Sequence, residues 1–121
     1  LDEEQDLSQT DQAMQRNCMM FEADVLKSMK KYQEAAEVYR AVESLYSGQP
    51  AAIEAIVGQA SCARGLGDDR EFEILFRQAS EMLKQIPVEA DPEFTETTRY
   101  DREGWKQLLD WIIQDFDKQK A

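Results

Sequence analysis

Carboxylates are the most abundant side chains in this sequence that could do chemistry. The 121 residues include 25 Asp and Glu but no His, so acid–base catalysis would have to rest on pairs of carboxylates. Three acidic clusters stand out, EEQD at 3–6, GDD at 67–69 and DPE at 91–93. Each lies at an expected helix start or in a loop, where a carboxylate caps the first turn and complements the helix dipole. We therefore expect no enzyme, and an enzyme based on acidic residues is the third interpretation.

The two cysteines, Cys18 and Cys62, are too few and too far apart for a zinc site or a disulfide framework. The segment DPEFTETTRYD at 91–101 lacks the alternating Asp and Asn and the central Gly of an EF-hand loop. We expect two buried free thiols, no metal and no cofactor.

The formal net charge of −11 narrows the choice of partner. Acidic residues dominate both terminal segments, which would repel a phosphate backbone, so we expect no binding to nucleic acid. A protein or peptide partner that is basic or amphipathic suits this charge. No apolar stretch approaches the roughly 18 residues that span a bilayer, and we expect a soluble protein without membrane insertion, with the cytoplasm favoured. Because the sequence begins with Leu, we expect a processed protein or a segment of a longer one.

The elements that must position these side chains are all expected to be helices. Strand patterns are almost absent, and Ala, Glu, Gln, Lys, Leu and Met dominate. Ser8 should cap the first helix, Gly48 and Pro50 should separate the second from the third, and Asp68 or Asp69 should cap the fourth. We predict one all-α domain of five helices, over residues 8–29, 31–47, 50–65, 69–85 and 101–118, with 87–100 as a linking segment anchored by Phe94 and Tyr100.

Apolar residues three or four apart predict the buried face of each helix. We expect these inward residues: Met14, Cys18, Phe21, Val25 and Met29 in the first helix; Ala35, Val38, Tyr39, Val42 and Leu45 in the second; Ile53, Ile56, Val57, Ala60 and Ala63 in the third; Phe72, Leu75, Phe76, Ala79, Met82 and Leu83 in the fourth; and Trp105, Leu108, Leu109, Ile112 and Phe116 in the fifth, with Trp111 and Ile113 widening that stripe.

An internal repeat links the second helix to the fourth at an offset of 37 residues. KKYQEAAEVYRAV (30–42) and GDDREFEILFRQA (67–79) resemble the second helix of the tetratricopeptide repeat, and Ala23 occupies a site where that family has a small residue. The matching positions are Tyr32, Ala35, Tyr39, Gly67, Asp68, Phe76 and Ala79. The resemblance implies two stacked hairpins, 8–47 and 50–85, in a short right-handed solenoid, with 101–118 as a capping helix.

The resemblance also implies a function, because such repeats resemble scaffolds that hold a peptide or a helix in a concave groove. Transferred to this sequence, the groove positions are Met20, Asp24, Lys27, Val57, Ser61 and Arg64. Asp24 and Ser61 stand where the family's carboxylate clamp would have Asn, which argues against a chaperone tail as ligand. The three charged residues are equally compatible with an ordinary solvated surface.

Self-association is the alternative function. Two repeats and a cap fall short of the three or so repeats usually needed for a stable stack. Met19, Met20 and Leu26 of the first helix could then pack against a second copy, or against neighbouring repeats if the sequence is a structural or spacer segment of a longer repeat protein.

Overall fold

The computed structural model describes residues 8–120, so the EEQD cluster lies outside the described residues. The described part is all-α, as predicted, and contains no strand. It has one α-helix more than predicted because the linking segment folds into a 3₁₀ turn and a short helix. The elements are α2 (Gln9–Ser28), α3 (Tyr32–Leu45), α4 (Pro50–Gly65), α5 (Asp69–Gln85), η1 (Val88–Ala90), α6 (Asp91–Thr97) and α7 (Arg102–Lys120).

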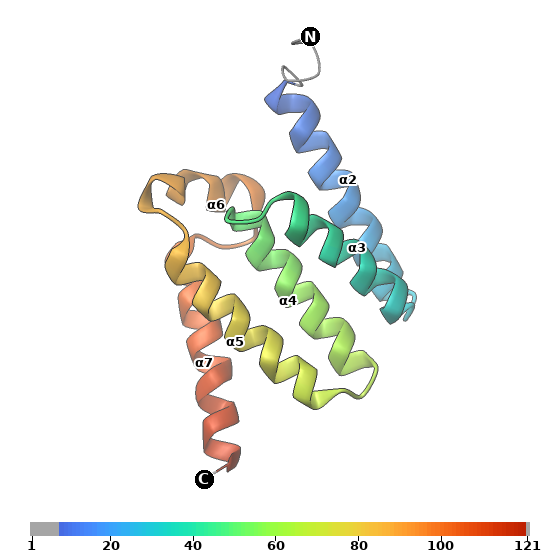
Figure 1. The fold of residues 1–121 in the computed structure, drawn as a ribbon, viewed down its shortest axis with the longest axis vertical. Coiled ribbons are helices and arrows are strands. Elements are labelled where there is room, and N and C mark those ends of the chain that lie inside the picture. The colour runs from blue at the N-terminus through green and yellow to red at the C-terminus, as the bar shows by residue number, and fades with distance from the viewer. Residues whose placement is uncertain (1–7, 121) are drawn as a thin grey trace.

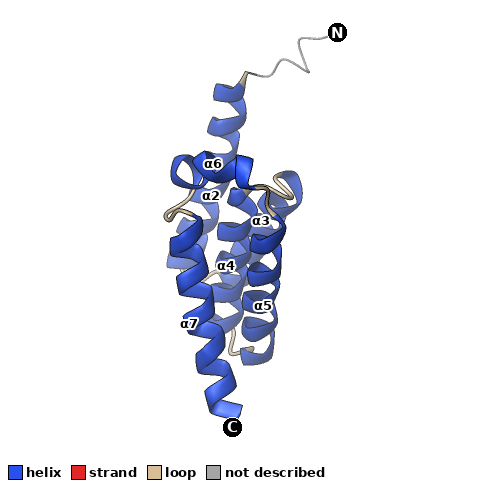
Figure 2. Ribbon diagram, turned by 90° about the vertical axis from the view of Figure 1, so that its left-hand side faces the viewer, coloured by secondary structure: helices blue, strands red, loops and turns tan. Residues whose placement is uncertain are grey.

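Consecutive long helices pack against each other in antiparallel order, α2 on α3, α3 on α4, α4 on α5 and α5 on α7 (Figure 1). Helices α2, α4 and α7 therefore run in the same direction. The short α6 crosses one end of this arrangement and contacts α4. The first turns of α2 extend beyond the ends of the other long helices (Figure 2).

The helix ends follow local sequence signals. Ser8 Oγ accepts the Asp11 N–H at 3.1 Å, and Asp68 Oδ1 accepts the Glu71 N–H at 3.1 Å, so Asp68 rather than Asp69 is the cap of α5. Gly48 has a φ of 77°, which favours glycine, and Pro50 is the first residue of α4.

Two tyrosines set the distance between α3 and α4. A Cβ on Gly58 would lie 2.5 Å from the ring of Tyr39, and one on Gly65 would lie 2.5 Å from the ring of Tyr32. The two tyrosines are seven residues apart on α3, and the two glycines are seven residues apart on α4. The two rings therefore pack directly on the backbone of α4 where it has no side chain. With α3 on one side and α5 on the other, α4 is buried on almost all sides.

Arg102 joins the start of α7 to the end of α5. Its guanidinium donates to the carbonyl oxygens of Leu83 at 3.0 Å and Ile86 at 2.8 Å, and its Nε donates to Asp91 at 2.6 Å. These carbonyls belong to the end of α5, where helical partners are missing. Arg102 thereby fixes α7 beside α5, and Trp105, Leu109 and Phe94 complete the larger core.

The predicted inward face of α2 is wrong. Met14 is 61% exposed, Phe21 71% and Met29 56%, while Val25 and Cys18 are also exposed. The buried face is on the other side, where fully buried Ala23 packs with the small residues Ala35 and Ala36. Small side chains let the two helices approach closely, and that contact outweighs the greater hydrophobicity of the opposite face.

The structure also differs from three smaller predictions. Both cysteines are free, but only Cys62 is buried, so the prediction of a buried thiol is wrong for Cys18. Leu45 is exposed because α3 ends there, and Tyr46 is buried in its place with its hydroxyl donating to the Gln12 carbonyl at 3.2 Å. Trp111 is 69% exposed and does not widen the buried apolar face of α7.

Candidate functional site

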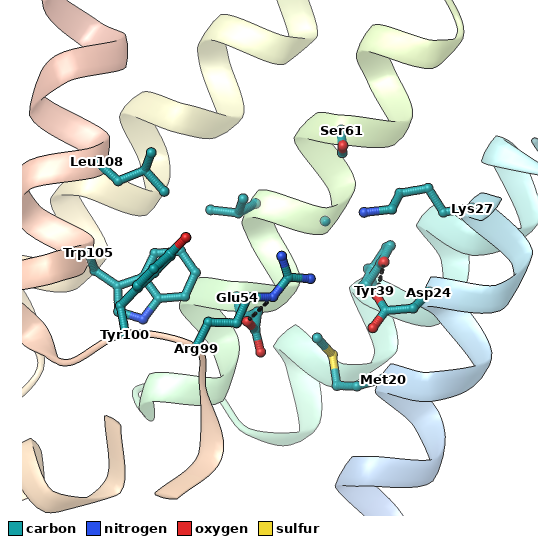
Figure 3. A pocket seen from close by; sticks show the side chains of 12 residues that line it. Met20, Asp24, Lys27, Tyr39, Glu54, Ser61, Arg99, Tyr100, Trp105 and Leu108 are labelled. Atoms are coloured by element: carbon teal, nitrogen blue, oxygen red, sulfur yellow. Dashed lines mark hydrogen bonds and ion pairs between the residues drawn. The ribbon is translucent and has the colours of Figure 1, made fainter. Parts of the chain in front are cut away.

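A hollow of about 130 Å³ opens between α2, α4 and the start of α7 (Figure 3). Side chains from segments far apart in the sequence converge on it. Its lining consists of Met20, Asp24 and Lys27 from α2, Tyr39 from α3, Glu54, Val57, Gly58 and Ser61 from α4, Arg99 and Tyr100 from the segment before α7, and Trp105 and Leu108 from α7.

Five of the six groove residues predicted from the repeat pattern line this hollow, and Arg64 does not. Its guanidinium lies 5.0 Å from the centre of the Phe72 ring, at a second hollow of about 480 Å³ between α5 and α7. Val57, Ser61 and Arg64 follow one another at helical spacing on a single face of α4. That face therefore connects the two hollows.

The residues predicted for self-association lie elsewhere than expected. Met19, Met20 and Leu26 are partly buried and pack against the cores that α2 shares with α3 and α4. Met20 also lines the hollow. These three side chains belong to the inner side of α2, because the face of this helix that points outward is the one predicted to be buried.

Tyr39 forms the floor of the hollow. Its ring is buried against Gly58, and its hydroxyl donates a hydrogen bond to Asp24 Oδ1. Burial raises the pKa of Tyr39 far above its ordinary value, and the hydrogen bond to Asp24 adds to that effect. The hydroxyl therefore stays a neutral donor, and Asp24 is held in place by it.

Glu54 and Arg99 form an ion pair at the edge of the hollow, with Arg99 Nε 3.1 Å from Glu54 Oε2 (Figure 3). The two partners differ in exposure, because the Glu54 side chain is 14% exposed and that of Arg99 is 63% exposed. Burial raises the pKa of Glu54, and the positive charge of Arg99 opposes this shift. The charged form of the mostly buried Glu54 carboxylate is thus stabilised by a cation whose side chain is mostly exposed.

Aromatic rings form the wall on the α7 side. Tyr100 meets Trp105 edge to face, with ring centres 5.1 Å apart, and Trp105 Nε1 donates to Thr98 Oγ1 at 2.9 Å. On the opposite side, Lys27 Nζ lies 5.9 Å from the centre of the Tyr39 ring. The sequence pattern did not predict the part that Glu54, Arg99 and Tyr100 take in the hollow. Arg99 and Tyr100 lie at the hollow because of the way residues 87–101 fold, and this segment has no hydrophobic periodicity that could predict its position.

Comparison with known proteins finds no match: no family model, no curated protein and no solved structure matches this chain. Within residues 8–120, no three His, Cys, Asp or Glu side chains gather as a metal site would require. No helix in that part of the chain is long and apolar enough to cross a membrane. What the hollow can bind therefore follows from its own side chains, which bring carboxylates, cations and aromatic rings together.

Proposed function

We propose that this chain is a non-catalytic interaction module that holds a segment of another protein in the hollow and along the adjoining face of α4. The observation that carries the proposal is the convergence of residues from α2, α4 and α7 on one opening. The two carboxylates there are already engaged, Asp24 by the Tyr39 hydroxyl and Glu54 by Arg99. This supports binding over acid–base chemistry, which needs a carboxylate free to exchange a proton with a substrate.

The architecture that we propose is a short right-handed stack of two tetratricopeptide-like hairpins, α2–α3 and α4–α5, with α7 as the capping helix. The 37-residue offset between α3 and α5 and the order of helix contacts support it. In such a stack the first helices of the hairpins line the concave side. Helices α2 and α4 are those first helices here, and both contribute to the hollow.

The size of the hollow suits one side chain of a partner rather than a whole small molecule. Its volume of about 130 Å³ is close to that of a protein cavity that holds one benzene molecule, about 150 Å³. Drug-sized ligands occupy roughly 300 Å³ or more. We therefore propose that one anchoring side chain enters here while its neighbours lie along α4 toward Arg64 and the second hollow.

The chemistry of the lining favours Lys or Arg as that anchor. The aliphatic part of such a side chain would pack on Trp105 and Leu108, and its cationic end would reach Glu54 in place of Arg99. Exchange of one cation for another costs little because Arg99 is mostly exposed. The net charge of −11 would also attract basic segments over a distance. The partner is therefore an amphipathic peptide segment with a basic residue beside apolar ones.

A matched pair of substitutions tests this function. Ser61 is exposed and lines the hollow, whereas Ser44 is exposed on α3 and outside the lining. Ser61→Trp should fill the opening, and Ser44→Trp adds the same side chain elsewhere. Peptides selected from a displayed random library against the unmodified chain should contain Lys or Arg next to apolar residues.

The affinity of the selected peptides, measured by fluorescence anisotropy, decides the outcome. Ser61→Trp should weaken binding at least tenfold, about 1.4 kcal/mol, and Ser44→Trp should leave it unchanged, with both variants melting at the temperature of the unmodified chain. Selected peptides that bind Ser61→Trp as tightly as the unmodified chain would contradict the proposal.

A further inference from the structure

The outer face of α2 carries an apolar stripe that nothing in the described part of the chain covers. Met14, Cys18, Phe21, Val25 and Met29 are all exposed and lie three or four residues apart. The stripe is about 22 Å long at 1.5 Å per residue. Single exposed apolar side chains are common, but five aligned on one helix face are typical of an interaction surface.

We infer that this stripe binds the same stripe of a second copy, with the two α2 helices antiparallel. The residue types are self-complementary in that arrangement. If the two-fold axis passes between the Phe21 side chains, Met14 of each copy lies opposite Met29 of the other, and Cys18 lies opposite Val25. Every apolar residue of the stripe then has an apolar neighbour across the interface.

The charges at the two ends of α2 select the antiparallel orientation. Asp11 lies in the first turn, and Lys30 and Lys31 follow directly after the last turn. In the antiparallel pair Asp11 of one copy lies beside the two lysines of the other, at both ends of the interface. A parallel pair would instead bring like charges and like ends of the helix dipoles together.

Glu22 limits the strength of this association. It is exposed on the edge of the stripe, one residue from Phe21, so the two-fold axis would place the two Glu22 side chains near each other. Like charges at such a distance oppose binding. The pair is therefore a reversible dimer, and removal of the Glu22 charge should strengthen it.

The dimer also relates the two hollows. Met20, Asp24 and Lys27, which line the hollow, lie on one side of α2, about 100–160° around the helix from the stripe. A two-fold axis perpendicular to both helices leaves this side facing the same way in both copies. Two hollows would then open in one direction and could bind a partner with two basic segments more tightly than one hollow alone.

Sedimentation of the chain at concentrations between about 1 µM and about 1 mM tests the dimer. We expect a concentration-dependent shift from monomer to dimer. Phe21→Ser should weaken the association at least tenfold, and Glu22→Gln should strengthen it by about twofold. Trp111→Ser, which removes an equally exposed aromatic side chain from α7, should leave it unchanged. A monomer at all concentrations, or equal effects of Phe21→Ser and Trp111→Ser, would overturn the inference.

Disulfide trapping tests the orientation. In the antiparallel pair the two Cys18 lie about 10 Å apart along the helices, beyond the reach of a disulfide. The double variant Glu22→Cys, Cys18→Ser has its thiols near the axis and should form a linked dimer under mild oxidation, whereas the unmodified chain should not. Equal linking through Cys18 in the unmodified chain would show a parallel pair and overturn the inferred register.

Discussion

Tyr39→Phe removes one hydroxyl from the floor of the hollow and should change both the stability of the chain and its response to alkali. The hydroxyl donates to the Asp24 carboxylate. A hydrogen bond to a charged group contributes about 1.5–3 kcal/mol, and the lower end applies because Asp24 is partly exposed. At pH 7 the variant should therefore be about 1.5 kcal/mol less stable.

The pH dependence follows from the pKa of Tyr39, which burial and then Asp24 hold far above the ordinary value of a tyrosine. In the unfolded chain this pKa returns to about 10. The contribution of Tyr39 to stability is therefore full below pH 10. Above pH 10 the unfolded chain ionises while the folded chain stays protonated, so the folded state loses about 1.4 kcal/mol by pH 11. The phenylalanine that replaces Tyr39 in the variant has no proton to lose.

Urea unfolding of both proteins between pH 7 and pH 11, followed by circular dichroism, measures this effect. The gap between the original chain and Tyr39→Phe should be about 1.5 kcal/mol at pH 7 and should nearly close by pH 11. The other tyrosines and the lysines titrate equally in both proteins and cancel in the difference. Two parallel stability profiles would refute the reasoning, since they would mean that Tyr39 is not a buried neutral donor.

Three further substitutions test the packing and electrostatics around the hollow. Gly58→Ala should lower the stability of the chain, measured by thermal unfolding, by about 1–3 kcal/mol, because the new methyl group overlaps the Tyr39 ring. Ser61→Ala on the same helix is the control, and an equal loss of stability in both variants would contradict this prediction. Arg102→Lys should lower the free energy of unfolding in urea by about 2–3 kcal/mol, because Lys cannot reach Asp91 and the carbonyls of α5 together. An unchanged urea midpoint would show that α7 is held by apolar contacts alone. Glu54→Gln should stabilise the chain at pH 7, because burial raises the pKa of Glu54 and so penalises its charged form. That gain in stability should become smaller when urea unfolding is measured at lower pH, down to about pH 4, because Glu54 takes up a proton. A loss of stability at pH 7 would instead mean that the ion pair with Arg99 outweighs the effect of burial.

Helix positions were predictable because their signals are local. Ser8, Gly48, Pro50 and Asp68 act on the backbone within a few residues, and each has the predicted role at a helix end. The faces of α5 and α7 were predictable for a related reason, since each of these helices has one dominant apolar side.

Helix α2 was less predictable because it has two sides that could pack. Hydrophobicity favours the stripe with Phe21, but the structure buries the side with Ala23. The contact depends on the small residues Ala35 and Ala36 of a different helix, which no periodicity within α2 can reveal. The repeat alignment, which puts a small residue at Ala23, points to the correct side.

The hollow was predictable only in part. Its residues on α2 and α4 follow from which helix faces run side by side, and five of the six predicted residues lie there. Glu54, Arg99 and Tyr100 depend on how residues 87–101 return toward α4, which is set by tertiary contacts such as those of Arg102. The ion pair of Glu54 and Arg99 joins positions 45 residues apart, beyond the range of any local pattern.

The most direct test of the proposed binding site is a nuclear magnetic resonance titration of the isotopically labelled chain with a selected basic, amphipathic peptide. If the peptide anchors in the hollow, the amide resonances of Val57, Ser61 and Leu108 should shift with increasing peptide. Those of Ser44 on α3 and Glu81 on α5, which lie outside the lining, should stay in place. Shifts confined to α3 and α5, with the resonances of the hollow unchanged, would contradict the account.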